Sequence, residues 1–127
     1  MQDRHLYEYA VIRIVPVLER EEFINVGVIV FCKKEKFIKM HFKLNEEKLS
    51  AFCKDIDVEQ ILLNLKSFEK IANGNNDGGP IAEMDIASRF RWLTAVKSSV
   101  IQTSRPHPGL CTNLELTAKR LFDELVL

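Results

Sequence analysis

Three strand-like segments follow one another within the first 44 residues, with no helix-like segment between them. Residues 7–15 are rich in β-branched and aromatic side chains and end at Pro16, which lacks the N–H that a strand interior needs. Residues 23–32 are almost entirely apolar, and residues 36–44 follow after a short polar turn. Parallel strands need a long crossover, so this order favours an antiparallel sheet, with a hairpin formed by the second and third segments.

The apolar spacing changes to that of a helix after the third segment. Apolar residues around Leu49, and then from Val58 to Ala72, recur every three or four positions, which predicts two successive helices. Asp57 followed by Gln60 is a capping box in which each side chain can bond a free backbone N–H, and Asn73-Gly74 is a stop signal. The boundaries of the second helix are therefore well marked.

The remainder of the chain predicts a loop, a short helix, a strand and a closing helix. Residues 73–80 are turn formers, which predicts a mobile loop. Residues 84–93 predict a helix, 98–103 a strand, and a last helix begins at about Asn113 with Thr112 as its cap. We therefore expect a single compact α+β domain over residues 1–127, with a mostly antiparallel sheet of about four strands covered by helices.

The composition limits the function classes that the chain can have. Its 18 basic and 18 acidic residues cancel, so no overall field draws it to nucleic acid, and the lysines of residues 33–43 are interpreted as a solvated sheet edge. The longest apolar run, Val26 to Cys32, is too short for a membrane helix, and the first residues lack a signal-peptide core. We expect a soluble, cytoplasmic protein that binds neither membrane nor nucleic acid.

Motifs of the standard catalytic and cofactor-binding classes are absent from the sequence. The three cysteines are widely separated, without a C-x-x-C pair, and the three histidines follow no metal-ligand spacing. No phosphate-binding glycine loop, dinucleotide fingerprint, H-E-x-x-H helix or G-x-S-x-G elbow is present. The sequence thus predicts no metal, no cofactor and no catalytic residue, and it leans against an enzyme.

Polar side chains are densest near the C-terminus, between Arg89 and His107. Arg89 and Arg91 can fork onto a phosphate or carboxylate, and Ser104 can add a hydroxyl. His107 lies between two prolines, which predicts a stiff surface turn that presents its imidazole to solvent. One interpretation is a pocket for a phosphate-bearing small molecule or nucleotide, formed by Arg89, Arg91, Ser104 and His107.

The alternative interpretation of this segment is structural. Phe90 and Trp92 would then belong to the core, and the arginines would pair with nearby carboxylates such as Glu83 or Asp85. The hydroxyls would pair along a sheet edge, and His107 would be a turn residue without a catalytic role. Both interpretations remain open at the level of sequence.

A second candidate polar site lies on the expected sheet itself. Arg13 shares a strand face with apolar residues, so it needs a partner or a route to water. Asn25 and Gly27 share a face of the next strand, where a glycine allows another backbone or a ligand to approach closely. Alternatively, Arg13 binds Glu21 or Glu22 and Gly27 marks a bulge or bend.

Three blocks of the chain resemble, in this order, the bacterial family of domains of unknown function numbered thirty thirty-seven. The blocks are Tyr9 to Pro16, Glu22 to Phe31, and a third that runs from Arg89 to Ala95, from Ser98 to Ser104 and from His107 to Leu110. One local departure is Ser104-Arg105, where the family more usually has Ser-Pro, and this affects the turn at His107.

What this resemblance implies is a partner rather than an activity. Members are often encoded beside a protein that resembles the HipA-type kinases of toxin–antitoxin systems. We therefore expect a non-catalytic accessory module that binds a partner protein, with a HipA-like kinase as the partner that the resemblance implies. The alternative is a small enzyme or sensor that binds a phosphate-bearing ligand through Arg89, Arg91, Ser104 and His107.

Overall fold

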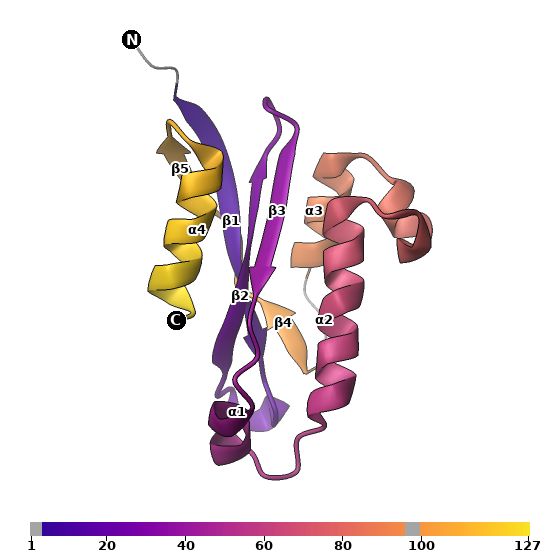
Figure 1. Ribbon diagram of the computed structural model, residues 1–127, viewed down its shortest axis with the longest axis vertical. Coiled ribbons are helices and arrows are strands. Elements are labelled where there is room, and N and C mark those ends of the chain that lie inside the picture. The colour runs from indigo at the N-terminus through magenta and orange to yellow at the C-terminus, as the bar shows by residue number, and fades with distance from the viewer. Residues whose placement is uncertain (1–3, 96–99) are drawn as a thin grey trace.

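The computed structural model describes residues 4–95 and 100–127, which form an antiparallel sheet with helices on both faces (Figure 1). The strands are β1 (His5–Ile14), β2 (Ile24–Cys32), β3 (Phe37–Phe42), β4 (Ile101–Thr103) and β5 (His107–Cys111). The helices are α1 (Glu46–Phe52), α2 (Val58–Asn73), α3 (Ile86–Thr94) and α4 (Leu114–Leu125). The expected α+β class and mostly antiparallel sheet are confirmed.

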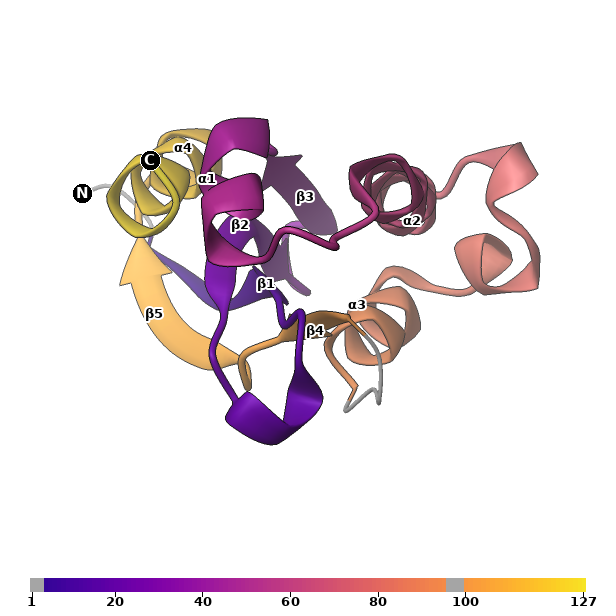
Figure 2. The same ribbon diagram turned by 90° about the horizontal axis from the view of Figure 1, so that it is seen from below.

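β1 is the centre of the sheet. It pairs with β2 along one edge, and its other edge is shared by β4, opposite Ile12 to Ile14, and β5, opposite His5 to Tyr9. β3 pairs with β2 and ends the sheet on the far side, so the expected hairpin of the second and third segments is confirmed. Figure 2 shows β5 curving towards α4, away from α2 and α3.

Each face of the sheet has its own core. On one face, residues such as Ile12, Ile14 and Ile29 pack against Leu65 of α2 and Leu93 of α3. On the other face, α4 covers an alternate set of strand residues; this second core comprises Tyr7, Val30, Cys32, Leu114, Ala118 and Leu121. Because β2 contributes side chains to both cores, its sequence is apolar throughout instead of alternating.

The predicted ends of α2 are largely confirmed. The Asp57 side chain accepts a hydrogen bond from the backbone N–H of Gln60 at 3.1 Å, and Gly74 ends the helix in the left-handed conformation with φ 67°. The Gln60 side-chain nitrogen donates to the Asn64 side chain at 3.0 Å, along the exposed face of α2. The predicted loop that follows contains two short 3-10 turns, and an ion pair of 2.9 Å joins Asp77 to Lys70 of α2.

Two features near the C-terminus differ from the sequence prediction. His107 and Pro108 belong to strand β5, not to a surface turn; β5 is an edge strand, where a proline can direct its missing N–H away from the partner strand. The cap of α4 is Asn113, whose side chain accepts from the N–H of Leu116 at 3.0 Å, so the helix begins one residue later than Thr112 predicts. The strand predicted at 98–103 is β4; residues 98 and 99 lie outside the described residues.

A β-bulge in β2 explains the glycine that the sequence singled out. Arg13 pairs with Asn25, but Ile12 pairs with Gly27, so β2 carries one extra residue, Val26, at this point. A Cβ on Gly27 would lie near Ile12 and β3, which places Gly27 on the opposite sheet face from Asn25. The expectation that the two share a face is therefore wrong, and the bulge interpretation is correct.

The packing of α4 on β3 predicts a pH effect on stability. The His41 ring of β3 lies 5.8 Å from the Phe122 ring of α4, measured between centroids. Burial is the main cause that lowers the pKa of His41 below 6.5, and the charge of Lys39 adds to it. The acids Glu115, Asp123 and Glu69 oppose this shift. In the window between the folded-state pKa and 6.5, the unfolded chain binds more protons. We expect the free energy of unfolding to decrease as the pH falls below about 6.5.

Urea titrations of the wild-type protein and of His41→Gln at several pH values test this expectation. The wild-type curve of stability against pH should slope upwards from acid to neutral pH, and His41→Gln should reduce that slope. Equal slopes for the two proteins would show that His41 does not carry the effect.

No helix in the described part of the chain combines the length and the apolar character that are needed to cross a bilayer.

Candidate functional site

The six polar residues predicted from sequence do not form one site. Arg89 and Arg91 belong to α3, on the sheet face that α2 and α3 cover. Arg13, Asn25 and His107 lie on the opposite sheet face, which α4 covers. Ser104 lies between β4 and β5, at the edge of β1. The proposed convergence of Arg89, Arg91, Ser104 and His107 on one pocket is therefore not observed.

Arg89 has a structural role at the end of α2. Its Nη1 donates to the carbonyl oxygens of Ile71 at 3.2 Å and Ala72 at 3.1 Å, and the guanidinium lies against Gly74. A cation at this position bonds free carbonyls and complements the negative end of the helix dipole. Arg91, two positions along α3, is exposed. The carboxylate pairing expected for Arg89 is replaced by these carbonyl contacts.

The aromatic residues beside these arginines divide between the core and the surface. Phe90 is buried and stacks on Phe31 of β2, with ring centroids 4.8 Å apart. Trp92 lies edge-on to Phe68 of α2 and remains partly exposed. The structural interpretation of this segment thus holds for Phe90, and neither ring lies beside His107.

Ser104 joins the two short strands to β1. It is buried, and its Oγ accepts the N–H of Val11 at 2.9 Å while donating to the carbonyl of Arg105 at 3.1 Å. The N–H of Ser104 also donates to the carbonyl of Val11 at 2.8 Å. The Ser104 hydroxyl therefore replaces a backbone acceptor for the N–H of Val11 in the gap between β4 and β5, and both of its hydrogen bonds stabilise the fold.

We expect Ser104→Ala to destabilise the protein by about 1–3 kcal/mol, because it leaves the buried N–H of Val11 without an acceptor. Ser67→Ala is the matched control: its hydroxyl donates to Leu63 on the exposed surface of α2, and its loss should change stability by less than about 0.5 kcal/mol. Denaturant titration measures both variants. Equal effects of the two substitutions would contradict this role of Ser104.

His107 lies opposite Tyr9 in the sheet, with ring centroids 5.3 Å apart. The imidazole is exposed, and among the described residues no carboxylate or hydroxyl hydrogen bonds to it. A general acid or base needs a group that orients it. The geometry around His107 therefore supports a surface position without a catalytic arrangement.

Arg13 and Asn25 are neighbours in the sheet. They pair across β1 and β2, and the Arg13 guanidinium lies 4.1 Å from the centre of the Phe23 ring. Within the described residues Arg13 forms no ion pair; Glu22, one of its expected partners, binds Arg20 instead. The buried Nε of Arg13 and the buried Oδ1 of Asn25 have no hydrogen-bond partner in this part of the chain. The Asn25 amide donates to the carbonyl of Leu125, at the end of α4.

An apolar groove at one end of the sheet was not predicted. Two adjoining hollows of about 150 and 370 Å³ share Pro16, Val17 and Cys53. We call them together the end groove. Its apolar lining comes from the β1–β2 connection, the end of α1, the α1–α2 connection, α2 and the residue before β4, and consists of Pro16, Val17, Phe52, Cys53, Ile56, Ile61 and Val100.

The end groove exposes large apolar side chains to solvent. Val17 is 42% exposed, and Phe52 and Val100 are each 38% exposed. The acids Asp55 and Asp57 lie on its rim, whereas the charge of Glu22 at the other end is matched by Arg20. The sequence carried no clear signal for this groove, because Phe52 and Val100 fall within the predicted helix and strand periods that would bury them, yet both are exposed.

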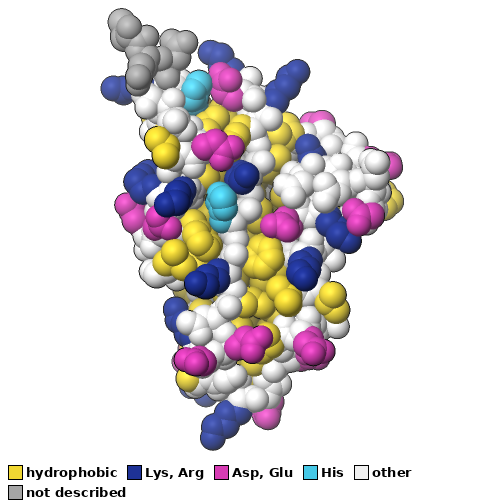
Figure 3. All heavy atoms as spheres, viewed as in Figure 1, with side chains coloured by type: hydrophobic (Ala, Val, Ile, Leu, Met, Phe, Trp, Pro, Cys, Tyr) yellow, Lys and Arg dark blue, Asp and Glu magenta, His cyan; other side chains and the backbone are white. Residues whose placement is uncertain are grey.

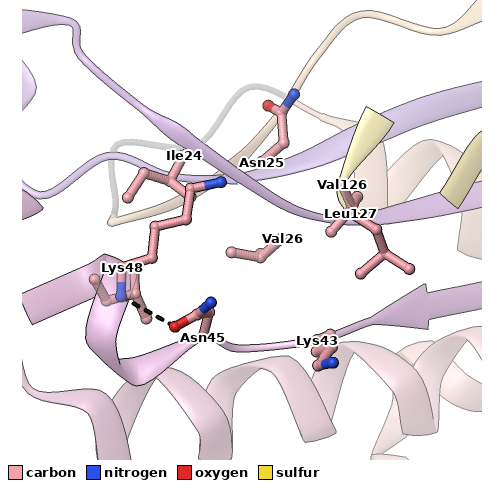
Figure 4. Close-up of a pocket in the computed structure, with 9 residues that line it drawn as sticks. Ile24, Asn25, Val26, Lys43, Asn45, Lys48, Val126 and Leu127 are labelled. Carbon is pink, nitrogen blue, oxygen red and sulfur yellow. Dashed lines mark hydrogen bonds between the residues drawn. The ribbon is translucent and has the colours of Figure 1, made fainter. Parts of the chain in front are cut away.

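A third pocket, of about 270 Å³, lies between the end of α4 and the start of α1 (Figure 4). Lys43, Lys48 and Asn45 line it, and the Asn45 side chain accepts the N–H of Lys48 as the cap of α1. Asn25 projects from the opposite side of β2 to Val26, as Figure 4 shows. Both lysines are exposed, so their charges are solvated.

No group of three or more His, Cys, Asp or Glu side chains in the described part of the chain is placed to hold a metal ion. The three cysteines are free; Cys32 is buried, and Cys53 and Cys111 are half-buried. The strongest feature for binding is therefore the end groove.

Comparison with known proteins gives a family. No curated protein and no solved structure matches the chain. The family model described as "Protein of unknown function (DUF3037)" matches residues 9–126, which is nearly the whole chain. The chain therefore belongs to the DUF3037 family of proteins of unknown function.

Proposed function

We propose that this protein is a non-catalytic module that binds a partner protein through the end groove. The observation that supports this is the exposure of Val17, Phe52 and Val100 around two adjoining hollows. Apolar side chains that are exposed singly are ordinary, but a contiguous patch with a polar rim is typical of a binding surface. Covering it removes apolar area from water, which stabilises a complex.

The rim of the groove defines the chemistry of the partner. Asp55 and Asp57 lie beside the apolar lining, and the Arg20–Glu22 pair is neutral as a unit. A segment that inserts apolar side chains and carries lysine or arginine beside them matches this surface. A HipA-like kinase, which the family resemblance implies as a genomic neighbour, is the first partner to test.

The alternative function, a sensor or enzyme for a phosphate-bearing ligand, has little support from the geometry. Arg89 bonds the carbonyls of α2, Ser104 is committed to β1, and His107 lies on the other face of the sheet from α3. No specific observation favours this alternative over partner binding.

The proposal is tested by mixing the purified protein with a purified HipA-like kinase from the same genome and measuring complex formation by size-exclusion chromatography and calorimetry. A stable complex is expected, together with a higher melting temperature of this chain in excess kinase, because a partner that binds only the native state stabilises it. If the two proteins elute separately and no heat of binding is detected, this kinase is not the partner and the proposal fails for it.

A further inference from the structure

β3 leaves one hydrogen-bonding edge open. It ends the sheet, and no described strand pairs with its outer side. Figure 1 shows this edge running between α4 on one face and α2 on the other. An unpaired strand edge is a template for a further strand, and extended peptides commonly bind in this way.

The register identifies the backbone groups that point outward. The N–H of Lys43 donates to the carbonyl of Val26 at 2.8 Å, so this pair is hydrogen-bonded across β2 and β3. Hydrogen-bonded pairs alternate in an antiparallel ladder, and therefore Lys39 and His41 also direct their backbone groups to β2. It follows that Ile38, Met40 and Phe42 direct their N–H and carbonyl groups outward.

The side chains of this edge differ between the two faces. Ile38, Met40 and Phe42 pack with the core on the α2 side, and Ile38 and Phe42 are only half-buried. On the α4 side, the strand continues as Lys39, His41 and Lys43, with no acid among them. Figure 3 shows hydrophobic side chains gathered between the two helices along this edge.

We propose that the outer edge of β3 binds an extended segment of a partner protein in which acidic and apolar residues alternate. Backbone hydrogen bonds to Ile38, Met40 and Phe42 would hold the added strand. Its apolar residues would cover the half-buried side chains on the α2 side, and its acidic residues would lie beside Lys39 and Lys43 on the α4 side. The added strand is independent of the end groove.

The charged residues of α4 do not reverse this preference for an acidic partner segment. Lys119 and Asp123 of α4 form an ion pair of 3.8 Å, so they cancel. Glu115 is the remaining acid that lines the hollow of about 450 Å³ beside His41, against Lys39 and Lys43 on the strand. With Glu115 set against Lys39 and Lys43, the α4 side of the strand edge is net positive; Glu69 of α2 also acts on His41.

A second copy of this chain is a poorer occupant of the edge. Two β3 strands paired antiparallel about Met40 place Lys39 opposite His41 of the second copy and diagonal to Lys43 of the second copy. Four lysines would then lie in one row, and like charges at such positions destabilise a sheet.

The test uses soluble peptides of about eight residues that alternate valine with glutamate, or valine with lysine, and amide hydrogen exchange measured by NMR. The glutamate peptide should slow the exchange of the Ile38, Met40 and Phe42 amides at least about tenfold, while leaving the amides of Lys39 and His41 unchanged. The lysine peptide should not. The variant Lys39→Glu/Lys43→Glu should reverse the preference, and Lys33→Glu/Lys34→Glu in the exposed turn serves as its control.

Three results would overturn the proposal. The glutamate peptide could fail to slow exchange at the outward amides, or both peptides could slow it equally. Slowed exchange without peptide, increasing with protein concentration, would instead assign the edge to a second copy. Unchanged exchange of the Lys39 and His41 amides in each variant confirms that the β2–β3 pairing is intact.

Discussion

Gly27→Val is expected to destabilise the fold strongly. A Cβ at this position would lie 2.6 Å from the carbonyl oxygen of His41 and 2.9 Å from the Cβ of Phe42. Both atoms belong to or adjoin the β3 backbone, so relief requires the hairpin strands to separate at the bulge. We expect a loss of at least about 3 kcal/mol, against the roughly 5–15 kcal/mol that stabilises a typical domain.

Gly79→Ala is the matched control for this substitution. Gly79 has φ 85° and ψ −173°, but no atom lies within 4 Å of an added Cβ, so only the conformational cost remains, at about 1–3 kcal/mol. Urea titration followed by circular dichroism compares the two variants. If Gly27→Val is no more destabilised than Gly79→Ala, the close approach of β3 to β2 is not what requires the glycine.

Phe52→Glu is expected to weaken partner binding at least about 100-fold, or about 2.7 kcal/mol. Phe52 is exposed at the end of α1 and lines the end groove, so the substitution puts a charge into an apolar contact without opening a cavity in either core. The new carboxylate would also lie near Glu22. Val17→Glu, on the opposite connection, should have a similar effect.

Leu110→Glu provides the control for the groove variants. Leu110 is 59% exposed in β5, outside the end groove, so the same change of character should leave the affinity unchanged. Calorimetric titration of the kinase with each variant measures the affinities, and circular dichroism verifies folding. Equal losses for Phe52→Glu and Leu110→Glu would show that binding does not depend on the groove.

Local chemistry explains which parts of the fold the sequence predicted. The ends of α2 follow from Asp57 and Gly74, because a side-chain cap and a left-handed residue act within one turn of the chain. β5 was missed because Pro106 and Pro108 favour a turn locally, and only its position at the sheet edge allows the strand. The bulge at Gly27 depends on the approach of β3, which local sequence does not encode.

The candidate sites were predicted less completely than the fold. Sequence left open whether Arg13 and Asn25 form a polar site or are structural; the register of β1 and β2 pairs them. The grouping of Arg89 with His107 relied on nearness in the chain, but the sheet separates them. The end groove combines residues from connections that are distant in sequence, and no periodic pattern marks such a surface.

The central claim, that a partner occupies the end groove, is tested most directly by the rate at which iodoacetamide alkylates Cys53. This half-buried thiol lines both hollows of the groove, and Cys111, half-buried in β5 outside the groove, provides an internal reference in the same sample. Peptide mass spectrometry follows both residues with and without saturating kinase. Slower alkylation of Cys53 in the complex, with an unchanged rate at Cys111, is the result that we predict. A complex in which Cys53 reacts as fast as in the free protein would contradict the claim.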